Sequence, residues 1–480
     1  MELDELTIQH DSSLREAMAC MDANAQGICF VLDGKRLAGI LTDGDVRRAV
    51  LHGAALDNAV SQVMVKNCKS LPVDTPEPEI RRNLNHRIRH IPLVNQADEL
   101  VDYASLWRNH RIPVMEPQLN GNELEYVTEC IRTNWVSSQG RFVKIFEEQF
   151  EDYTTQPHAV STSSGTTALH LALMALEIGV GDEVILPDLT FAATINAVLY
   201  TGATPVLVDV DPENWTINPD AVSQAITSNT KALIPVHLYG HPCDMASLLS
   251  IAADHNLLLV EDCAQALGSE YQGQSMGSFG DAAMFSFFGN KTITTGEGGM
   301  VVFRDTRVAD RAKLLRDHGM DKDRRYWHPV IGYNYRMTNL QAALGVAQME
   351  RVQDLVNSKR ELAGLYRDQL GPIDWIQLPA EADWAANSYW LYTVILKKDA
   401  PISRDELIRE FQDMGVETRP MFYPLHEMPP YVHVRRIGDL SVTSRLAKSG
   451  ISLPSSPGTT IEDVSRTAEV LSELRTITIQ

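Results

Sequence analysis

Apolar runs alternate with segments of helical spacing through the middle of the chain. Runs such as KALIPVHL, NLLLVED and AAMFSFF are separated by segments such as CDMASLLSIAADH, whose apolar residues recur at helical intervals. Strands that are apolar throughout are typical of a parallel sheet covered on both faces by crossover helices. The pattern therefore predicts an α/β domain, which we place at residues 111–350.

The pattern changes after about residue 350. A long helical stretch, MERVQDLVNSKRELAGLYRDQL, leads into a mixed segment in which SYWLYTVIL has the composition of a strand. We therefore predict a smaller α+β domain at residues 351–480. Before the α/β domain, the stretch NHRIPVMEPQL combines two prolines with polar residues, which is typical of a linker.

The first hundred or so residues contain a repeat. The stretch GICFVLDGKRLAGILTDGDVRRAV (27–50) indicates a strand, a tight turn at Asp33-Gly34, a second strand and a helix that Thr42 can cap. HIPLVNQADELVDYASLWR (90–108) repeats that order. Two similar halves of this size predict a separate domain at residues 1–110 built from one duplicated unit.

Charge and cysteine usage exclude several classes of protein. The net charge of −21 argues against a nucleic-acid or anionic-membrane partner, because both require a cationic surface. The six cysteines are scattered without a C-x-x-C pair, which suggests neither a disulfide framework nor a zinc site. The acidic start MELDELTIQHDSSLREAM has no signal-peptide pattern, and no apolar run has membrane-spanning length. We expect a cytoplasmic protein.

The stretch HAVSTSSGTTALHLALMAL runs from a strand into a helix whose first turn carries hydroxyl groups. Ser164, Gly165 and Thr166 are candidates for a phosphate site, because free backbone N–H groups and hydroxyls at a helix start attract anions. One helix end contributes only about 0.3 to 1 kcal/mol, so it would position a phosphate group without retaining it alone. The alternative is that these residues only cap the helix.

Two carboxylates and an aromatic residue follow other predicted strands. Glu261 and Asp262 end the apolar strand of LLLVEDCAQALGS, at the edge where open α/β sheets bind ligands. A carboxylate there is a metal ligand, a helix cap or a counter-ion to a buried cation, and the sequence places no histidine or carboxylate partner near it for a metal. Phe191 lies in a similar strand-to-helix loop, where an aromatic ring could also fill the core.

Lys291 lies in SFFGNKTITTGEGGM, a glycine-containing loop directly after a strand. A lysine that follows a phosphate-binding helix and a strand-end aspartate is what pyridoxal phosphate (PLP) requires: an amine for a Schiff base and a carboxylate for the pyridine nitrogen. A P-loop is excluded, because Met284 stands where its first glycine should be. A surface lysine is the remaining alternative.

Three long motifs, EDCAQALG, FSFFGNKTITTGEGGMV and GYNYRMTNLQAALG, resemble the DegT/DnrJ family of PLP-dependent sugar aminotransferases. The resemblance extends from about residue 112 to the C-terminus. It implies the aspartate aminotransferase-like fold (fold type I of PLP enzymes) for the large domain, with the smaller α+β domain at the C-terminus. It also implies PLP as the cofactor and a homodimer or higher homo-oligomer, because family members build their sites at a dimer interface.

The resemblance assigns roles residue by residue. Lys291 would carry the cofactor and Asp262 would face the pyridine nitrogen, while Gln265 would contact the ring hydroxyl and Phe191 would stack on the ring. Ser164, Gly165, Thr166 and Ser286 would hold the phosphate, and Asn334 would reach it from a second subunit. Arg336 and His426 are further candidates for substrate contact, since the donor carboxylate and a sugar diphosphate are anionic.

The activity implied is transfer of an amino group from glutamate to a nucleotide-linked 4-keto-6-deoxy sugar, in surface polysaccharide or O-antigen biosynthesis. The stretches TNWVSSQG, SFFGNKT and ETRPMFYPLH favour GDP-4-keto-6-deoxy-mannose, with a UDP- or dTDP-linked sugar as the alternative. Dehydratases of the family replace the lysine by histidine or need grouped cysteines, so Lys291 argues for transfer. A PLP-loaded regulator without turnover is the non-enzyme alternative.

The repeat at residues 1–110 resembles a pair of CBS domains. Gly39, Thr42 and Asp45 match the G-x-x-T-x-x-D pattern with which that family binds the ribose of a nucleotide, whereas ELVDYASL in the second half departs from it. The resemblance implies a single site for a purine nucleotide. The alternatives are that Thr42 and Asp45 only cap a helix and that the pair only assists assembly.

Overall fold

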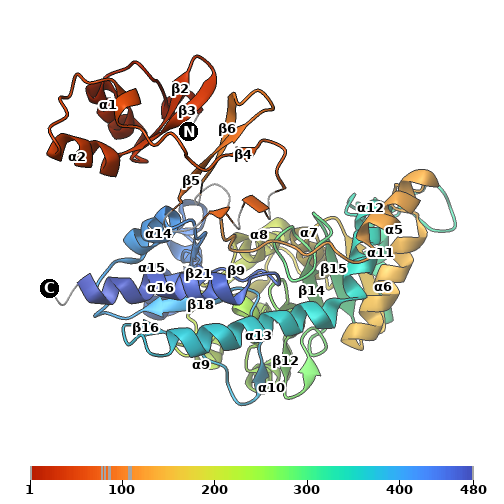
Figure 1. Cartoon of the computed structure of the whole chain (residues 1–480). Helices are drawn as coiled ribbons and strands as arrows, with labels where there is room; N and C mark the ends of the chain where they lie inside the picture. The colour runs from red at the N-terminus through yellow and green to blue at the C-terminus, as the bar shows by residue number, and fades with distance from the viewer. Residues whose placement is uncertain (1–2, 77–78, 81–82, 85–87, 106–110, 478–480) are drawn as a thin grey trace. The chain divides into compact units, whose positions relative to one another are not determined.

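The computed structural model describes residues 3–76, 79–80, 83–84, 88–105 and 111–477 (Figure 1). The chain divides into two compact units. The first comprises residues up to Arg111 together with Asp413–Gly415, and the second comprises 112–412 and 416–480. No helix in the described ranges combines the length and the hydropathy needed to cross a bilayer.

The first unit contains two sheets with the same strand order. Its elements are β1 (Thr7–Gln9), α1 (Leu14–Asn24), β2 (Ile28–Asp33), β3 (Arg36–Thr42), α2 (Asp43–Leu51), β4 (Leu71–Pro72), β5 (His90–Val94) and β6 (Leu100–Ser105). In each half the first strand pairs parallel with the second, which pairs antiparallel with the third. The predicted turn is present, with Gly34 at a φ of 65°, which glycine adopts without steric cost. The predicted repeat is therefore visible in the topology.

An eight-stranded sheet forms the centre of the second unit, in the order β20-β9-β8-β10-β11-β14-β15-β7. Its strands are β7 (His158–Thr162), β8 (Glu183–Pro187), β9 (Thr204–Val208), β10 (Thr230–Leu233), β11 (Leu258–Asp262), β14 (Ala282–Ser286), β15 (Gly299–Phe303) and β20 (Arg435–Arg436). β15 is antiparallel to both of its neighbours, and the other pairings are parallel. The carboxyl ends of β7, β8, β11 and β14 consequently meet at one edge.

Helices cover both faces of this sheet (Figure 1). They are α5 (Glu123–Arg132), α6 (Arg141–Thr154), α7 (Gly165–Ala175), α8 (Ala192–Thr201), α9 (Pro219–Ala225), α10 (Met245–His255), α11 (Thr306–Arg316) and α12 (Asn339–Met349). Adjacent strand residues enter different cores: Leu259 packs in the cluster that contains Phe146 of α6, and Val260 packs in the cluster that contains Leu169 of α7. Burial on both faces explains why these strands are apolar throughout.

The C-terminal part holds a four-stranded antiparallel sheet in the order β16-β18-β21-β19. Its elements are α13 (Val352–Leu370), β16 (Ile376–Gln377), β18 (Tyr392–Leu396), α14 (Arg404–Asp413), β19 (Arg419–Pro420), α15 (Ser441–Ser449), β21 (Gly450–Leu453) and α16 (Ile461–Ile477). β20, which lies between β19 and α15 in sequence, extends the large sheet instead. The domain boundary near residue 350 stays a prediction, because 112–412 and 416–480 form one compact unit.

Smaller elements complete the described structure. A three-stranded sheet joins β12 (Glu270–Tyr271), β13 (Gln274–Ser275) and β17 (Ala385–Ala386). Short 3-10 helices occur at η1 (Leu3–Leu6), η2 (Val60–Gln62), η3 (Leu238–Gly240), η4 (Leu425–Glu427) and η5 (Pro429–Tyr431).

Candidate active site

A cavity of about 430 Å³ opens at the carboxyl edge of the large sheet. Eight of the residues singled out from the sequence line it: Ser164, Gly165, Thr166, Phe191, Asp262, Gln265, Ser286 and Lys291. They come together because each lies at or just after the carboxyl end of a strand or in the loop that follows it, and most of these strands run in parallel.

The start of α7 forms one wall of the cavity. Gly165 is required there, because a Cβ on it would stand 2.7 Å from Cβ of Ser286 at the end of β14. The Ser164 hydroxyl accepts the Thr167 N–H, so the capping role that the sequence left open is present. The first N–H groups of a helix lack intrahelical acceptors. The backbone N–H groups of this turn, with the hydroxyls of Thr166 and Ser286, can therefore receive a phosphate.

Asp262 is a buried carboxylate at the end of β11. Burial raises its pKa, while the Thr194 hydroxyl, the Ala264 N–H and the charge of Lys291 act in the opposite direction. Thr194 Oγ1 donates to Oδ2 at 2.8 Å, and the Ala264 N–H donates to Oδ1 at 3.1 Å. Because a carboxylate has about four acceptor positions, Asp262 can accept a further N–H from a ligand in the cavity.

The Lys291 ammonium lies 3.6 Å from the ring centroid of Trp390. Burial lowers its pKa to about 7, with a smaller contribution in the same direction from Arg419 and an opposing one from Asp262. An amine with this pKa is largely neutral slightly above neutral pH and is then nucleophilic. Its place beside a buried carboxylate excludes the surface-lysine alternative.

Gln265 and Phe191 complete the walls. The Oε1 atom of Gln265 accepts the Tyr239 N–H at 2.9 Å, so its amide nitrogen is left to donate to a ligand. Phe191 is 60% exposed, and its ring centroid is 5.9 Å from that of Phe422. The alternative that Phe191 fills the core is therefore wrong.

Three predicted contacts lie outside the cavity lining of this chain. Asn334 is exposed and forms a β-bridge with Asp317. Arg336 pairs with Asp317 and lines a separate cavity of about 200 Å³. His426 donates from Nδ1 to Asp188 at 2.7 Å. Their predicted roles toward a second subunit or a substrate stay predictions.

Several residues of the lining were not predicted from the sequence. Trp390, Arg419 and Phe422 come from the C-terminal part of the chain. Arg419 lies in ETRPMFYPLH, a stretch that the family resemblance had already marked. Its guanidinium is 3.8 Å from Glu417, and its side chain is 42% exposed, so it can bind an anionic group of a substrate.

The premise that Glu261 has no nearby histidine is wrong. His237, Glu261 and Cys263 are buried together, and a ligand-type atom from each lies within 4.8 Å of the others. The Glu261 oxygens already accept the N–H groups of Gly277, Phe279 and Gly280 at 2.8 to 2.9 Å. We therefore assign Glu261 a structural role: its carboxylate holds the loop at residues 277–280.

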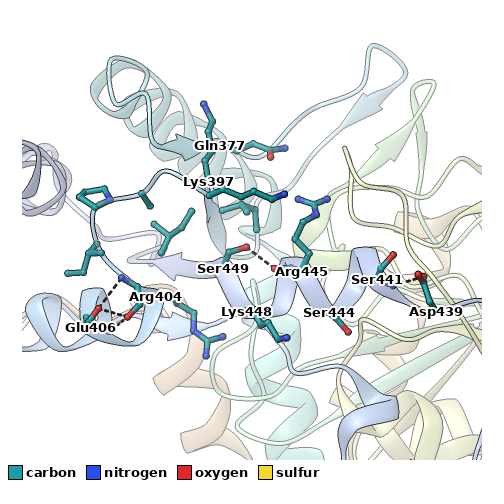
Figure 2. Close-up of a pocket in the computed structure, with 17 residues that line it drawn as sticks. Gln377, Lys397, Arg404, Glu406, Asp439, Ser441, Ser444, Arg445, Lys448 and Ser449 are labelled. Carbon is teal, nitrogen blue, oxygen red and sulfur yellow. Dashed lines mark hydrogen bonds between the residues drawn. The ribbon is translucent and has the colours of Figure 1, made fainter.

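A larger cavity of about 1060 Å³ lies on the C-terminal part, between the end of β18, the loop before α14 and one side of α15 (Figure 2). Its lining includes several cations: Lys397, Lys398, Arg404, Arg445 and Lys448. Neither Lys291 nor Asp262 belongs to it. The chemistry therefore concentrates in the smaller cavity at the sheet edge.

A phosphate receptor, a buried strand-end carboxylate and a lysine of lowered pKa in one cavity of this α/β fold define the site of a PLP-dependent aminotransferase. Comparison with known proteins agrees. The chain belongs to the DegT/DnrJ/EryC1/StrS aminotransferase family, whose model matches residues 117–472. The CBS domain model matches residues 1–52 and 60–107, which confirms the predicted pair.

Individual relatives support this assignment. The chain is 47% identical to GDP-perosamine synthase of Caulobacter vibrioides, over 76% of this chain and 98% of that protein. It is 45% identical to GDP-perosamine synthase of Escherichia coli O157:H7, over 75% and 98%. A Streptococcus pneumoniae protein solved in its PLP form superposes with a TM-score of 0.72 at 28% identity, covering 76% of this chain and 98% of that one. The predicted fold type I architecture and the cofactor are thereby confirmed.

The residues present fit PLP. The α7 start and Ser286 would hold its phosphate, Asp262 its ring nitrogen, Gln265 its ring hydroxyl and Phe191 its ring face. The close packing of Gly165 against Ser286, where a Cβ would stand 2.7 Å from Cβ of Ser286, is the observation that supports this fit, because it places the helix start and the Ser286 hydroxyl together beside one phosphate position.

Proposed function

We propose that this protein transfers the amino group of glutamate to a nucleotide-linked 4-keto-6-deoxy sugar, with GDP-4-keto-6-deoxy-mannose as the preferred substrate and GDP-perosamine as the product. The observation that carries the transfer is the Lys291 amine facing the same cavity as the buried Asp262 carboxylate. The choice of sugar is supported by two GDP-perosamine synthases at 45% and 47% identity. Such a product would serve surface polysaccharide or O-antigen biosynthesis.

The residues of the chain divide the work. When bound, PLP withdraws electrons from the α-carbon of an amino acid joined to it. Lys291 would hold the cofactor and, when its amine is free, would move the proton at the α-carbon of glutamate and, in the reverse direction, at the amine-bearing carbon of the sugar. Asp262 would keep the ring nitrogen protonated. Arg419, which lines the cavity together with Phe422, would bind the carboxylate of glutamate or the diphosphate of the sugar.

A panel of nucleotide sugars tests the substrate. With glutamate as donor, we expect turnover of GDP-4-keto-6-deoxy-mannose at a kcat/KM at least about tenfold above that of UDP- and dTDP-linked 4-keto-6-deoxy sugars, since one lost polar contact costs about that factor. Mass spectrometry of the sugar product measures this. Preference for a UDP- or dTDP-linked sugar would replace the substrate and leave the transamination, whereas no turnover of any sugar would favour a PLP-loaded regulator.

For the CBS pair we propose one purine nucleotide site near Gly39, Thr42 and Asp45. Two contacts of Asp45 compete with a ribose: its carboxylate closes a capping box with Thr42 and pairs with Arg48 at 2.6 Å. Gly39 has a packing reason of its own, because its Cβ would stand 2.6 Å from the Val65 carbonyl oxygen. A ribose would therefore bind Asp45 beside its cap contacts. The proposal rests on the CBS resemblance alone.

Calorimetry with the whole chain tests this site. We expect a purine nucleotide to bind and Asp45→Ala to weaken binding about tenfold, with an effect of the nucleotide on activity or assembly of about 1 to 3 kcal/mol. Asp43→Ala is the control, because it removes another acidic residue from the same helical turn. The absence of heat with any purine nucleotide would leave the pair as an assembly device.

We also propose a homodimer, in which Asn334 contributes to the site of the second subunit. Exposed apolar side chains near Asn334 support this, with Ile331 at 92% exposure. Light scattering measures the mass, and a monomer at working concentration would contradict the proposal.

We expect the reaction in the cytoplasm, where nucleotide sugars are available and all six cysteines, which are unpaired here, would stay reduced.

A further inference from the structure

Lys359 is a lysine in the interior of the second unit that the reaction described above does not use. It lies on α13 and is 1% exposed. Its ammonium donates to the carbonyl oxygens of Ser455 at 2.7 Å and Trp390 at 3.0 Å, and lies 3.5 Å from the sulfur of Met115. Among the described residues, no carboxylate lies within ion-pair distance of Lys359.

Burying the Lys359 amine without a carboxylate partner costs free energy, although the amine has no role in the reaction described above. Burial lowers the pKa of Lys359 to about 7, because the charged form loses its hydration. Both the ammonium and the neutral amine can keep the two carbonyl hydrogen bonds, since each carries at least two N–H groups. The geometry therefore indicates that Lys359 is a hydrogen-bond donor that holds these two carbonyl groups in place in either protonation state.

Trp390 connects Lys359 to Lys291, the lysine assigned to the cofactor. Trp390, whose carbonyl accepts from Lys359, donates its indole N–H to the Asn290 carbonyl oxygen at 2.7 Å. The face of the same ring lies 3.6 Å from the Lys291 ammonium. Trp390 thus holds the loop of Lys291 at two points, and Lys359 holds the backbone of Trp390.

Neighbouring contacts fix Trp390 further. The Ser455 hydroxyl accepts the Tyr392 N–H at 2.8 Å, two residues beyond Trp390, while the Ser455 carbonyl accepts from Lys359. The ring of Trp390 stacks on Tyr239, with centroids 6.1 Å apart and 16° between the planes. Without Lys359, the Trp390 and Ser455 carbonyls would lose the donor that joins them.

We propose that Lys359 is a positioning residue for the cofactor lysine: by tying the Trp390 and Ser455 carbonyls together it fixes Trp390, and through Trp390 it fixes Lys291 for its bond to PLP. The inference depends on the cofactor role of Lys291 and is independent of the identity of the sugar. It predicts that loss of Lys359 weakens PLP retention by more than a general loss of stability explains.

The test compares Lys359→Met, which keeps the length of the side chain, with Lys398→Met at an exposed position. Dialysis of the holoprotein against graded PLP gives the dissociation constant, and thermal unfolding of the PLP-free forms gives stability. We expect Lys359→Met to bind PLP about tenfold more weakly, the factor that one hydrogen bond to a charged group supports, and Lys398→Met to match the unchanged protein. Lys359→Gln, which can still donate, should recover part of the loss.

A double-mutant cycle with Trp390→Phe decides between positioning and a merely structural role. Trp390→Phe removes the indole N–H, so the effect of Lys359→Gln on PLP affinity should shrink in that background. This comparison also holds if Lys359→Met does not fold. Unchanged PLP affinity in Lys359→Met, or strictly additive effects of Lys359→Gln and Trp390→Phe in the cycle, would overturn the proposal.

Discussion

Replacing Lys291 by alanine is expected to abolish the visible absorbance of the lysine-bound cofactor and its trapping by borohydride. Lys291 is the lysine that lines the cavity together with Asp262, and no other side chain in that lining offers an amine. Turnover should fall by roughly 10²- to 10⁴-fold or more, the range that removal of a positioned acid–base group produces. Absorbance spectroscopy measures the first effect, borohydride reduction followed by peptide mass spectrometry measures the second, and an assay of product formation measures the fall in turnover.

Lys398→Ala is the matched control for this prediction, because Lys398 is exposed and lies outside the cavity at the sheet edge.

In the unchanged protein, PLP uptake by the PLP-free form should accelerate as the pH rises through about 7 and then level off. The sign follows from the lowered pKa of Lys291, since only the neutral amine attacks the aldehyde. A spectrum that survives in Lys291→Ala would sink the site assignment.

The sequence predicted the sheet edge well because the signal there is local. Ser164, Phe191, Asp262 and Ser286 each end or follow an apolar strand, and strands that run in parallel bring their carboxyl ends together. The antiparallel course of β15 between β14 and β7 was not predicted, because a short apolar run does not show its direction.

Residues from distant parts of the chain were harder to place. Trp390 and Arg419 reach the cavity from the C-terminal part, roughly a hundred or more positions beyond Lys291, and no periodicity connects them to it. His237 reaches Glu261 by the same kind of long-range packing, which is why the sequence argument placed no histidine there. Lys359 was not singled out from the helical stretch that contains it, since burial without a carboxylate leaves no local pattern.

Asp262→Asn is expected to lower the rate of amino-group transfer by roughly 10²- to 10³-fold while the protein still binds PLP. The variant keeps the shape of the side chain and an oxygen that Thr194 can reach, but it loses the negative charge that keeps the ring nitrogen protonated. The range corresponds to ~3–4 kcal/mol, which falls within what removal of one partner of a buried charge pair typically costs. Single-turnover kinetics with glutamate at saturating PLP measure the effect apart from cofactor loss.

Thr194→Val is the matched control for Asp262→Asn. It removes one hydrogen bond to the carboxylate and leaves the charge, so the rate should fall by no more than about tenfold. Burial raises the pKa of Asp262, whereas the Thr194 hydroxyl and the Ala264 N–H lower it. The pH at which transfer is half-maximal on the acid side should therefore rise in Thr194→Val, since the carboxylate is then protonated more readily. If the transfer rate fell equally in Asp262→Asn and Thr194→Val, the hydrogen bond between Thr194 and Asp262 would matter and the negative charge of Asp262 would not. That result would contradict the role of Asp262 toward the ring nitrogen.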